Sequence, residues 1–551
     1  MAADRIPDAC SPLWPLVAIA LLLVVQATMV FTRAINWDEF FYYSQVHQYL
    51  RGEAIAPLQT VHVHLFRWLP SVRGNPVDAI VLARLFMLAC EIVTVGCIVL
   101  LAERFADRTA GALAALAYLS AGFVLQHGFS FRVDPPTTAL LMGALTILAH
   151  CRLDTVRIAL FASAVAMAGM FTIKIVLFAP AFLGLAWMRW SESGRSGAMA
   201  LRLVAAGAIT LLAFAALYAA HSAAIAANAP ADVVSQRGAG VVTGAGEAVF
   251  FLGIPPYVQM MWKAISISLP MTALILLAPF AIWRARLPMT ARVALAGLWL
   301  PILTLFFYRN TAPYYYAFML APVAAGCVPA IELALKRFSP VLVSLVLVLL
   351  TIPVIVSEDR MTIANQRLVV EEASAMFTAP TAYFDHNGAL ASHVKANGFM
   401  TPWGLEGYRA HGRSLFRTLM ERQTVPLLFE NDLLLAALLT DEQGSDQLFP
   451  EDARVLRDNY VRVWGPVWLA GKTVAPGSRG RSEVLVPGHY RVEGGAVTID
   501  GTTRSPGTVV TLSRGDIELA NPGTNTARLV WADVDRMPRR PVPEGRIWIG
   551  F

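Results

Sequence analysis

Long apolar runs, separated by short polar stretches, fill the chain up to about residue 357. A helix needs roughly 20 apolar residues to cross a bilayer core of about 30 Å, so runs of this length predict transmembrane helices. The pattern therefore predicts a polytopic α-helical membrane region over residues 1–357. About eleven spans are predicted, at approximately residues 13–32, 77–101, 109–128, 136–151, 157–172, 175–190, 200–226, 260–283, 291–308, 314–333 and 340–357.

The pattern changes after residue 357, where two further regions are predicted. Residues 358–470 mix helical stretches such as "HGRSLFRTLMERQ" with short extended runs such as "VPLLFE", which indicates a small α/β domain. Residues 471–551 alternate short β-prone runs with turn sequences such as "EGG", "DGT" and "NPG". This last pattern predicts a β-sandwich-like module.

Composition and charge indicate where the chain resides. Of its 551 residues, 56% are hydrophobic and 15% are charged, which is typical of a membrane protein and not of a soluble enzyme. Lysine and arginine gather in alternate short loops, which are therefore expected to be cytoplasmic. This bias accounts for most of the net charge of +6 and gives no reason to expect nucleic acid. It also places residues 33–76 and the region after residue 358 outside the cytoplasm.

The region after residue 358 contains none of the five cysteines and no Asn-x-Ser/Thr sequence. An exported region without disulfides or glycosylation acceptors favours a bacterial envelope over a secretory lumen. The expected location is the bacterial cytoplasmic (inner) membrane, with the C-terminal domains in the periplasm.

Two adjacent carboxylates, Asp38 and Glu39, follow the first span in "AINWDEFFYYSQVHQYLRGE". Asn36 and Glu39 have the spacing of a capping box, and the apolar positions after them predict an amphipathic helix at the membrane surface. The capping box explains Glu39, but it does not require Asp38.

A third acid, Asp134, lies in "FSFRVDPPTTALL" at the next exported loop. Polar residues at membrane depth cost roughly 2.5 to 3.5 kcal/mol each on insertion, so those present there tend to serve a site or a partner. Arg132 is the nearest candidate partner, and a purely structural ion pair is one interpretation of "RVD".

Other polar side chains are predicted on the same exported face. The "HVH" sequence fits a metal site less well than a polar loop that contacts an acceptor, because its imidazoles are only two residues apart. The tyrosines of "PYYY" fit either a substrate site or an aromatic belt at the interface. No metal site is predicted, and a divalent-cation requirement is left open. The candidate substrate-binding residues are Arg132, Lys174, Arg309, Arg67, His62, His64, Tyr314 and Tyr315.

Together, the "WDE" after the first span, the amphipathic stretch behind it and the "RxD" of the second exported loop resemble the GT-C glycosyltransferases. The resemblance covers residues 13–357 and is closest to the protein O-mannosyltransferase and aminoarabinose transferase branch. It implies an integral membrane enzyme that takes a sugar from a polyprenyl-phosphate carrier. It also implies that Asp38 is the general base, that Asp134 organises the acceptor, and that Glu39 orients or substitutes for Asp38.

No "WWDYG"-like motif is present, so transfer of oligosaccharide to asparagine is not expected. The donor is activated because its phosphate leaves as a stabilised anion. The protein must supply a base for the acceptor hydroxyl and cations for the phosphate, for which Lys174, Arg309 and Arg67 are the candidates. One displacement with one base inverts the anomeric centre. The glycine-rich loop 227–259 fits either a segment that orders over bound substrate or a plain linker.

Two other function classes are compatible with a polytopic membrane chain. One is a transporter or flippase of lipid-linked sugars, and the other is a non-catalytic envelope assembly protein. Transporters more often show internal repeats and charges near the bilayer midplane, whereas the ionisable residues here gather at one face. This distribution favours the enzyme, whose acceptor is a glycan, a lipid or a protein.

Overall fold

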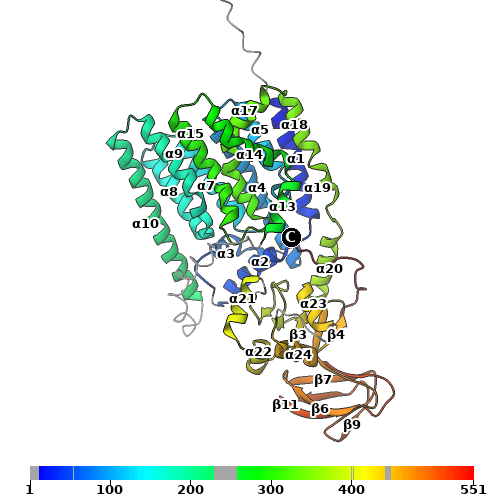
Figure 1. Ribbon diagram of the computed structural model, residues 1–551. Coiled ribbons are helices and arrows are strands. Elements are labelled where there is room, and N and C mark those ends of the chain that lie inside the picture. The colour runs from blue at the N-terminus through cyan, green and yellow to red at the C-terminus, as the bar shows by residue number, and fades with distance from the viewer. Residues whose placement is uncertain are drawn as a thin grey trace, which may run out of the picture.

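The computed structural model of the protein describes residues 12–53, 55–72, 74–228, 257–398, 400, 402–440 and 448–550. A helical bundle forms one end of the molecule, a mixed helix and strand region forms the other, and two short helices lie between them (Figure 1). The helices up to residue 357 are α1 (Leu13–Thr32), α2 (Trp37–Leu50), α3 (His62–Phe66), α4 (Pro76–Ala102), α5 (Arg108–Leu119), α6 (Gly122–His127), α7 (Asp134–His150), α8 (Thr155–Phe171), α9 (Ala179–Glu192), α10 (Gly197–Asn228), α13 (Val258–Ser266), α14 (Leu269–Arg284), α15 (Met289–Trp299), α16 (Tyr315–Gly326), α17 (Val328–Leu335), α18 (Pro340–Leu349) and α19 (Ile352–Val356), with 3₁₀ turns η1 (Leu69–Ser71), η2 (Ile173–Phe178) and η3 (Leu300–Phe306).

Helix occurs in each of the predicted membrane spans, and α1 has the predicted bounds. In the described part of the chain, five helices are long and apolar enough to cross a membrane, or seven if each of two bent pairs is one span. The pairs are α13 with α14, bent by 101°, and α16 with α17, bent by 58°. Pro270 and Pro329 lie in the first turn of the second helix of each pair, where the missing N–H is tolerated. The count of eleven spans stays a prediction.

The C-terminal region contains helices and two sheets. The larger, eight-stranded sheet runs in the order β10-β7-β12-β5-β3-β1-β2, with β4 also paired to β5, and the smaller runs β6-β11-β8-β9. The elements are α20 (Thr362–Ser374), α21 (Pro402–His411), α22 (Phe416–Arg422), α23 (Leu433–Thr440), α24 (Pro450–Asn459), β1 (Ala382–Phe384), β2 (Val394–Lys395), β3 (Leu427–Phe429), β4 (Tyr460–Trp464), β5 (Val467–Val474), β6 (Arg479–Val484), β7 (Gly488–Glu493), β8 (Val497–Ile499), β9 (Thr502–Arg504), β10 (Val509–Leu512), β11 (Gly515–Ala520) and β12 (Ala527–Trp531).

The larger sheet joins the two regions that the sequence separates. Strand β3 of the α/β part pairs with β5, and β5 pairs with β12 of the β-rich part, both antiparallel. The boundary predicted between residues 470 and 471 therefore falls inside β5. Turn sequences mark where strands end, but they do not show which strands pair, so the pattern alone could not reveal a shared sheet.

The C-terminal region also packs against the segment that follows α1. The Gln366 amide donates to the Ile35 carbonyl at 2.8 Å, and its side-chain oxygen accepts from the Ile35 N–H at 2.7 Å. The ring of Phe40, on α2, meets the edge of Trp548 with centroids 6.3 Å apart. The first loop and the C-terminal region thus lie on the same side of the bundle, and one hydrophobic cluster runs through both.

Candidate active site

Helix α2 begins with the predicted capping box. The Asn36 side-chain oxygen accepts from the backbone N–H of Asp38 at 3.0 Å and of Glu39 at 3.2 Å, while Glu39 Oε1 accepts from the Asn36 N–H at 3.2 Å. These bonds satisfy N–H groups that a helix start otherwise leaves without a partner. Because successive helical residues point about 100° apart, the two carboxylates leave the helix in different directions.

Glu39 is held in a buried clamp. Arg84 of α4 donates to its two oxygens at 2.7 and 2.6 Å, and the backbone N–H of Phe131 donates to Oε2 at 2.8 Å. The remaining Arg84 N–H groups reach the carbonyls of Arg33 and Ala34, just after α1, at 2.8 and 2.9 Å. Both charged side chains are only 1% exposed. Arg84 therefore connects the end of α1 to the start of α2 by binding both the carbonyls after α1 and the Glu39 carboxylate.

Asp38 belongs to a different arrangement, a chain of alternating charges. Arg132 donates through Nη1 to Asp38 Oδ2 and through Nε to Asp134 Oδ2, the latter at 3.2 Å. Lys174 of η2 donates to the second oxygen of Asp134. Two acids and two cations from three distant segments thus meet at the end of the bundle that faces the C-terminal region. We call these four residues the charge cluster.

The members of the charge cluster differ in accessibility. The Asp38 side chain is 11% exposed, whereas the Asp134 and Arg132 side chains are 3% and 4% exposed. Both Asp134 oxygens bind cations. Among the described residues, hydrogen bonds to the Asp38 side chain reach Oδ2 only. Asp38 is therefore the acid of the cluster that can accept a further hydrogen bond.

Tyrosine rings cover the cations of the charge cluster. The Arg132 Cζ lies 3.2 Å from the ring centroid of Tyr314 and 5.5 Å from that of Tyr42. The Lys174 Nζ lies 5.7 Å from the Tyr314 centroid. A ring face attracts a cation most strongly where water is excluded, and Tyr314 is buried. The Tyr314 hydroxyl is anchored by donating to Asn310 Oδ1 at 3.0 Å.

Three other predicted binding residues have different surroundings. Arg309 donates to both oxygens of Glu406, on α21, at 2.8 and 2.7 Å, so it links the bundle to the C-terminal region. The Tyr315 hydroxyl is buried and hydrogen-bonded to the Thr304 hydroxyl. Arg67 is exposed just after α3. The sequence grouped these residues with Lys174 because all lie near the same membrane face, but that criterion says nothing about which groups touch.

The two histidines of "HVH" point to different partners. His62 Nε2 lies 3.2 Å from the Tyr42 carbonyl oxygen, and burial lowers the pKa of His62 to about 4. His64 Nε2 lies 2.8 Å from Nδ1 of His221 on α10. Within the described ranges, no group of three or more His, Cys, Asp or Glu side chains is placed to hold a metal ion. Residues 229–256 of the predicted substrate loop lie outside the described part of the chain.

Two features of the site were missed from the sequence. Arg84 stands inside the apolar run 77–101, and an arginine within a span is a signal of a buried partner. Trp37, beside Asp38, stacks on His386 with ring centroids 5.1 Å apart and planes inclined by 10°. No sequence signal links that pair, because the two residues lie in different regions and meet only in the folded chain.

No protein-family model matches the chain, and a search of curated proteins finds no relative. Among solved structures it is similar to ArnT from Cupriavidus metallidurans bound to undecaprenyl phosphate, with a TM-score of 0.53 and 13% identity over 78% of this chain and 95% of that chain. The apo state of the same protein gives a TM-score of 0.51 and 13% identity, over 78% and 94%. The likeness shows that this chain shares the fold of the ArnT structures. The predicted resemblance is confirmed at this level.

Proposed function

We propose that the protein transfers a sugar from a polyprenyl-phosphate donor to an acceptor hydroxyl at the periplasmic face of the bacterial cytoplasmic membrane. The observation that carries this proposal is the charge cluster, in which Arg132 joins Asp38 to Asp134 beneath the C-terminal region. The GT-C fold supports it, and so does the undecaprenyl phosphate bound to the similar ArnT structure.

Asp38 is the general base of the proposed reaction. Its Oδ1 takes the proton of the acceptor hydroxyl while the acceptor oxygen forms a bond to the anomeric carbon. The bond from that carbon to the phosphate oxygen breaks with its electron pair, and polyprenyl phosphate leaves. This single displacement inverts the anomeric centre, and base assistance of this kind is worth about 10²–10⁴ in rate.

The cations of the cluster pair with its acids and meet the charge of the phosphate. Arg132 divides its hydrogen bonds between two acids, so Asp38 is paired with a cation without a bidentate clamp on both of its oxygens. Lys174 is the first candidate to bind the leaving phosphate, because its ammonium is compact and lies at the end of the charge chain. Asp134 acts through these cations, as a positioning residue.

Glu39 serves the reaction by placing Asp38. Both of its oxygens are taken by Arg84 and the capping box, so it has no oxygen left for a substrate proton. A carboxylate held in this way fixes the first turn of α2 and hence the direction in which Asp38 leaves it. Substitution for Asp38, the other role considered for Glu39, would require the buried clamp to open.

The test is sugar transfer by the purified protein from a synthetic undecaprenyl-phosphate sugar to a hydroxyl acceptor, with product identified by mass spectrometry and its anomeric configuration by NMR. Wild type is expected to form product with inverted configuration, and Asp38→Asn is expected to lose it. Equal turnover by both proteins would overturn the proposal. Movement of lipid-linked sugar across vesicles without product would instead establish the flippase.

A further inference from the structure

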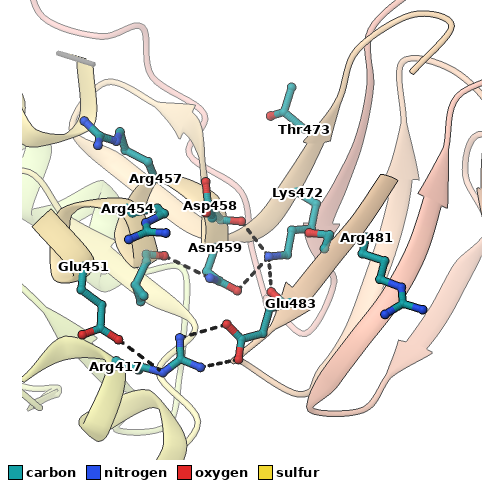
Figure 2. A pocket seen from close by; sticks show the side chains of 12 residues that line it. Arg417, Glu451, Arg454, Arg457, Asp458, Asn459, Lys472, Thr473, Arg481 and Glu483 are labelled. Atoms are coloured by element: carbon teal, nitrogen blue, oxygen red, sulfur yellow. Dashed lines mark hydrogen bonds and ion pairs between the residues drawn. The ribbon is translucent and has the colours of Figure 1, made fainter. Parts of the chain in front are cut away.

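A pocket lies in the C-terminal region, where α24 faces β5 and β6 (Figure 2). It has a volume of about 710 Å³, within the usual range of about 300–1,000 Å³ for ligand sites. Figure 1 places α24 and β6 at the end of the molecule away from the bundle. Among the described residues that line the pocket, Val455 alone is apolar. A lining this polar does not suit a hydrophobic ligand.

Lys472 forms the floor of this pocket and is buried. Its ammonium donates to the carbonyl oxygen of Asp458 at 2.8 Å, to Asn459 Oδ1 at 2.9 Å and to the carbonyl oxygen of Glu483. All three acceptors are neutral oxygens, and the nearby carboxylates of Asp458 and Glu483 offset part of the burial cost of the charge. Burial lowers the pKa of Lys472 to about 8, which still leaves it largely protonated at neutral pH. A buried cation of this kind is stabilised by an anion that enters the pocket.

Two arginines extend the positive charge from the floor to the rim. Figure 2 shows Arg454, on α24, and Arg481, on β6, on the two sides of the pocket with Lys472 between them. Both are exposed; Arg454 has no carboxylate of a described residue within ion-pair distance, and Arg481 lies opposite Glu518 of β11, whose charge acts on it without a direct ion pair. Arg417 differs, because Glu483 already binds its guanidinium, with Nη1 to Oε2 at 3.0 Å. Arg454 and Arg481 are therefore the two exposed guanidinium groups whose removal tests the pocket.

We infer that this pocket binds an oligosaccharide that carries carboxylate or phosphate groups, at a site separate from the charge cluster. A guanidinium fork matches the two oxygens of such groups, and the lining contains five cations against three carboxylates. Thr473, Ser482 and Asn459 supply neutral groups suited to sugar hydroxyls. The choice of a saccharide over another polyanion rests on the proposed function, whereas the anion site itself does not.

The inference is tested by calorimetric titration of the full chain in detergent. The probes are tetragalacturonate, for carboxylate groups, and phosphorylated maltotetraose, for phosphate groups, each compared with neutral maltotetraose. The double variant Arg454→Ala/Arg481→Ala removes exposed groups without an ion pair, and Arg504→Ala on β9 is the matched control outside the pocket. At least one anionic probe is expected to bind wild type and the control variant. Its binding to the double variant should be at least tenfold weaker, and added salt should weaken its binding to wild type.

Unchanged binding by the double variant, or equal binding of neutral maltotetraose, would overturn the site. Equally tight binding of tetraglutamate or of inorganic phosphate alone would overturn the saccharide as its ligand. Asp38→Asn is expected to bind the anionic probe as wild type does, and the double variant is expected to transfer sugar to a small neutral acceptor. Failure of the pocket and failure of the proposed transferase are thereby distinguished.

Discussion

Asp38 and Glu39 are adjacent in the chain, but their carboxylates differ in burial and in the number of hydrogen bonds they accept. Glu39 and Arg84 form a closed pair, 1% exposed, in which every carboxylate oxygen is taken. Asp38 shares one cation with Asp134 and keeps 11% of its side chain accessible. Glu39 thus supports the fold, whereas Asp38 is accessible to a substrate. The two differ because neighbouring positions on a helix point their side chains in different directions.

The physical basis is the cost of burying charge. A buried ion pair contributes to a fold only when all its lone pairs and protons are matched, and removing one partner leaves an uncompensated charge. The Glu39 pair meets that condition through the capping box and the carbonyls after α1. In the charge cluster each cation has a second acid or a ring beside it, so a partner can be exchanged for a substrate group at lower cost.

The largest expected effect is that of Asp38→Asn on turnover. Loss of the base is expected to lower kcat by about 10²–10⁴-fold. The thermal midpoint is expected to fall less than in Glu39→Gln, because Asp38 is the more accessible acid and Arg132 keeps its contact with Asp134. The measurement is steady-state transfer with the synthetic donor. Asp78→Asn, an exposed acid paired with Arg367, is the matched control and is expected to remain active. A fully active Asp38→Asn protein would remove the distinction between the two acids.

Glu39→Gln is expected to act on stability instead. It leaves the buried Arg84 with a neutral partner, and breaking a buried pair costs about 3–5 kcal/mol. The thermal midpoint in detergent should fall, and the fraction that stays folded should keep transferring sugar at a measurable rate. Glu53→Gln, in a partly exposed pair with Arg51, is the control. Loss of all turnover in fully folded Glu39→Gln protein would show that Glu39 takes part in the chemistry.

Lys174→Met tests the far end of the charge cluster. Removal of a preorganised cation is expected to lower kcat by about 10²-fold, because the leaving phosphate loses a stabilising charge. Lys174→Arg keeps the charge and should recover most of the rate. The measurement is single-turnover transfer at saturating donor. If methionine and arginine reduce the rate equally, Lys174 contributes through its shape and not through its charge.

The smallest effect is expected for the exposed pair of Arg309 and Glu406. Their side chains are 29% and 54% exposed, and exposed pairs typically contribute about 0.2–1 kcal/mol. A double-mutant cycle with alanine at each position should give a coupling energy in that range and a modest change in transfer. A large loss of donor binding with Arg309→Ala alone would instead indicate that Arg309 binds the donor phosphate.

The site could be predicted from the sequence where the signal is local. The Asn36 and Glu39 spacing gave the capping box, and acids at the ends of two spans indicated that Asp38 and Asp134 lie at one face. What they contact could not be predicted in the same way. Arg84 reaches Glu39 from another helix, and β3 reaches β5 across a predicted domain boundary, because tertiary packing decides both. The length of the apolar runs predicted where helices lie, but it did not establish how many of those helices cross the membrane.

The contact between Phe40 and Trp548 has a consequence for biogenesis. The ribosome synthesises residue 548 long after residue 40, so α2, which bears the proposed base, can complete its packing only after the segment around Trp548 has been made. A nascent chain that has not reached this segment would lack the contact. The proposed transfer reaction would then begin only after the C-terminal region has folded against α2.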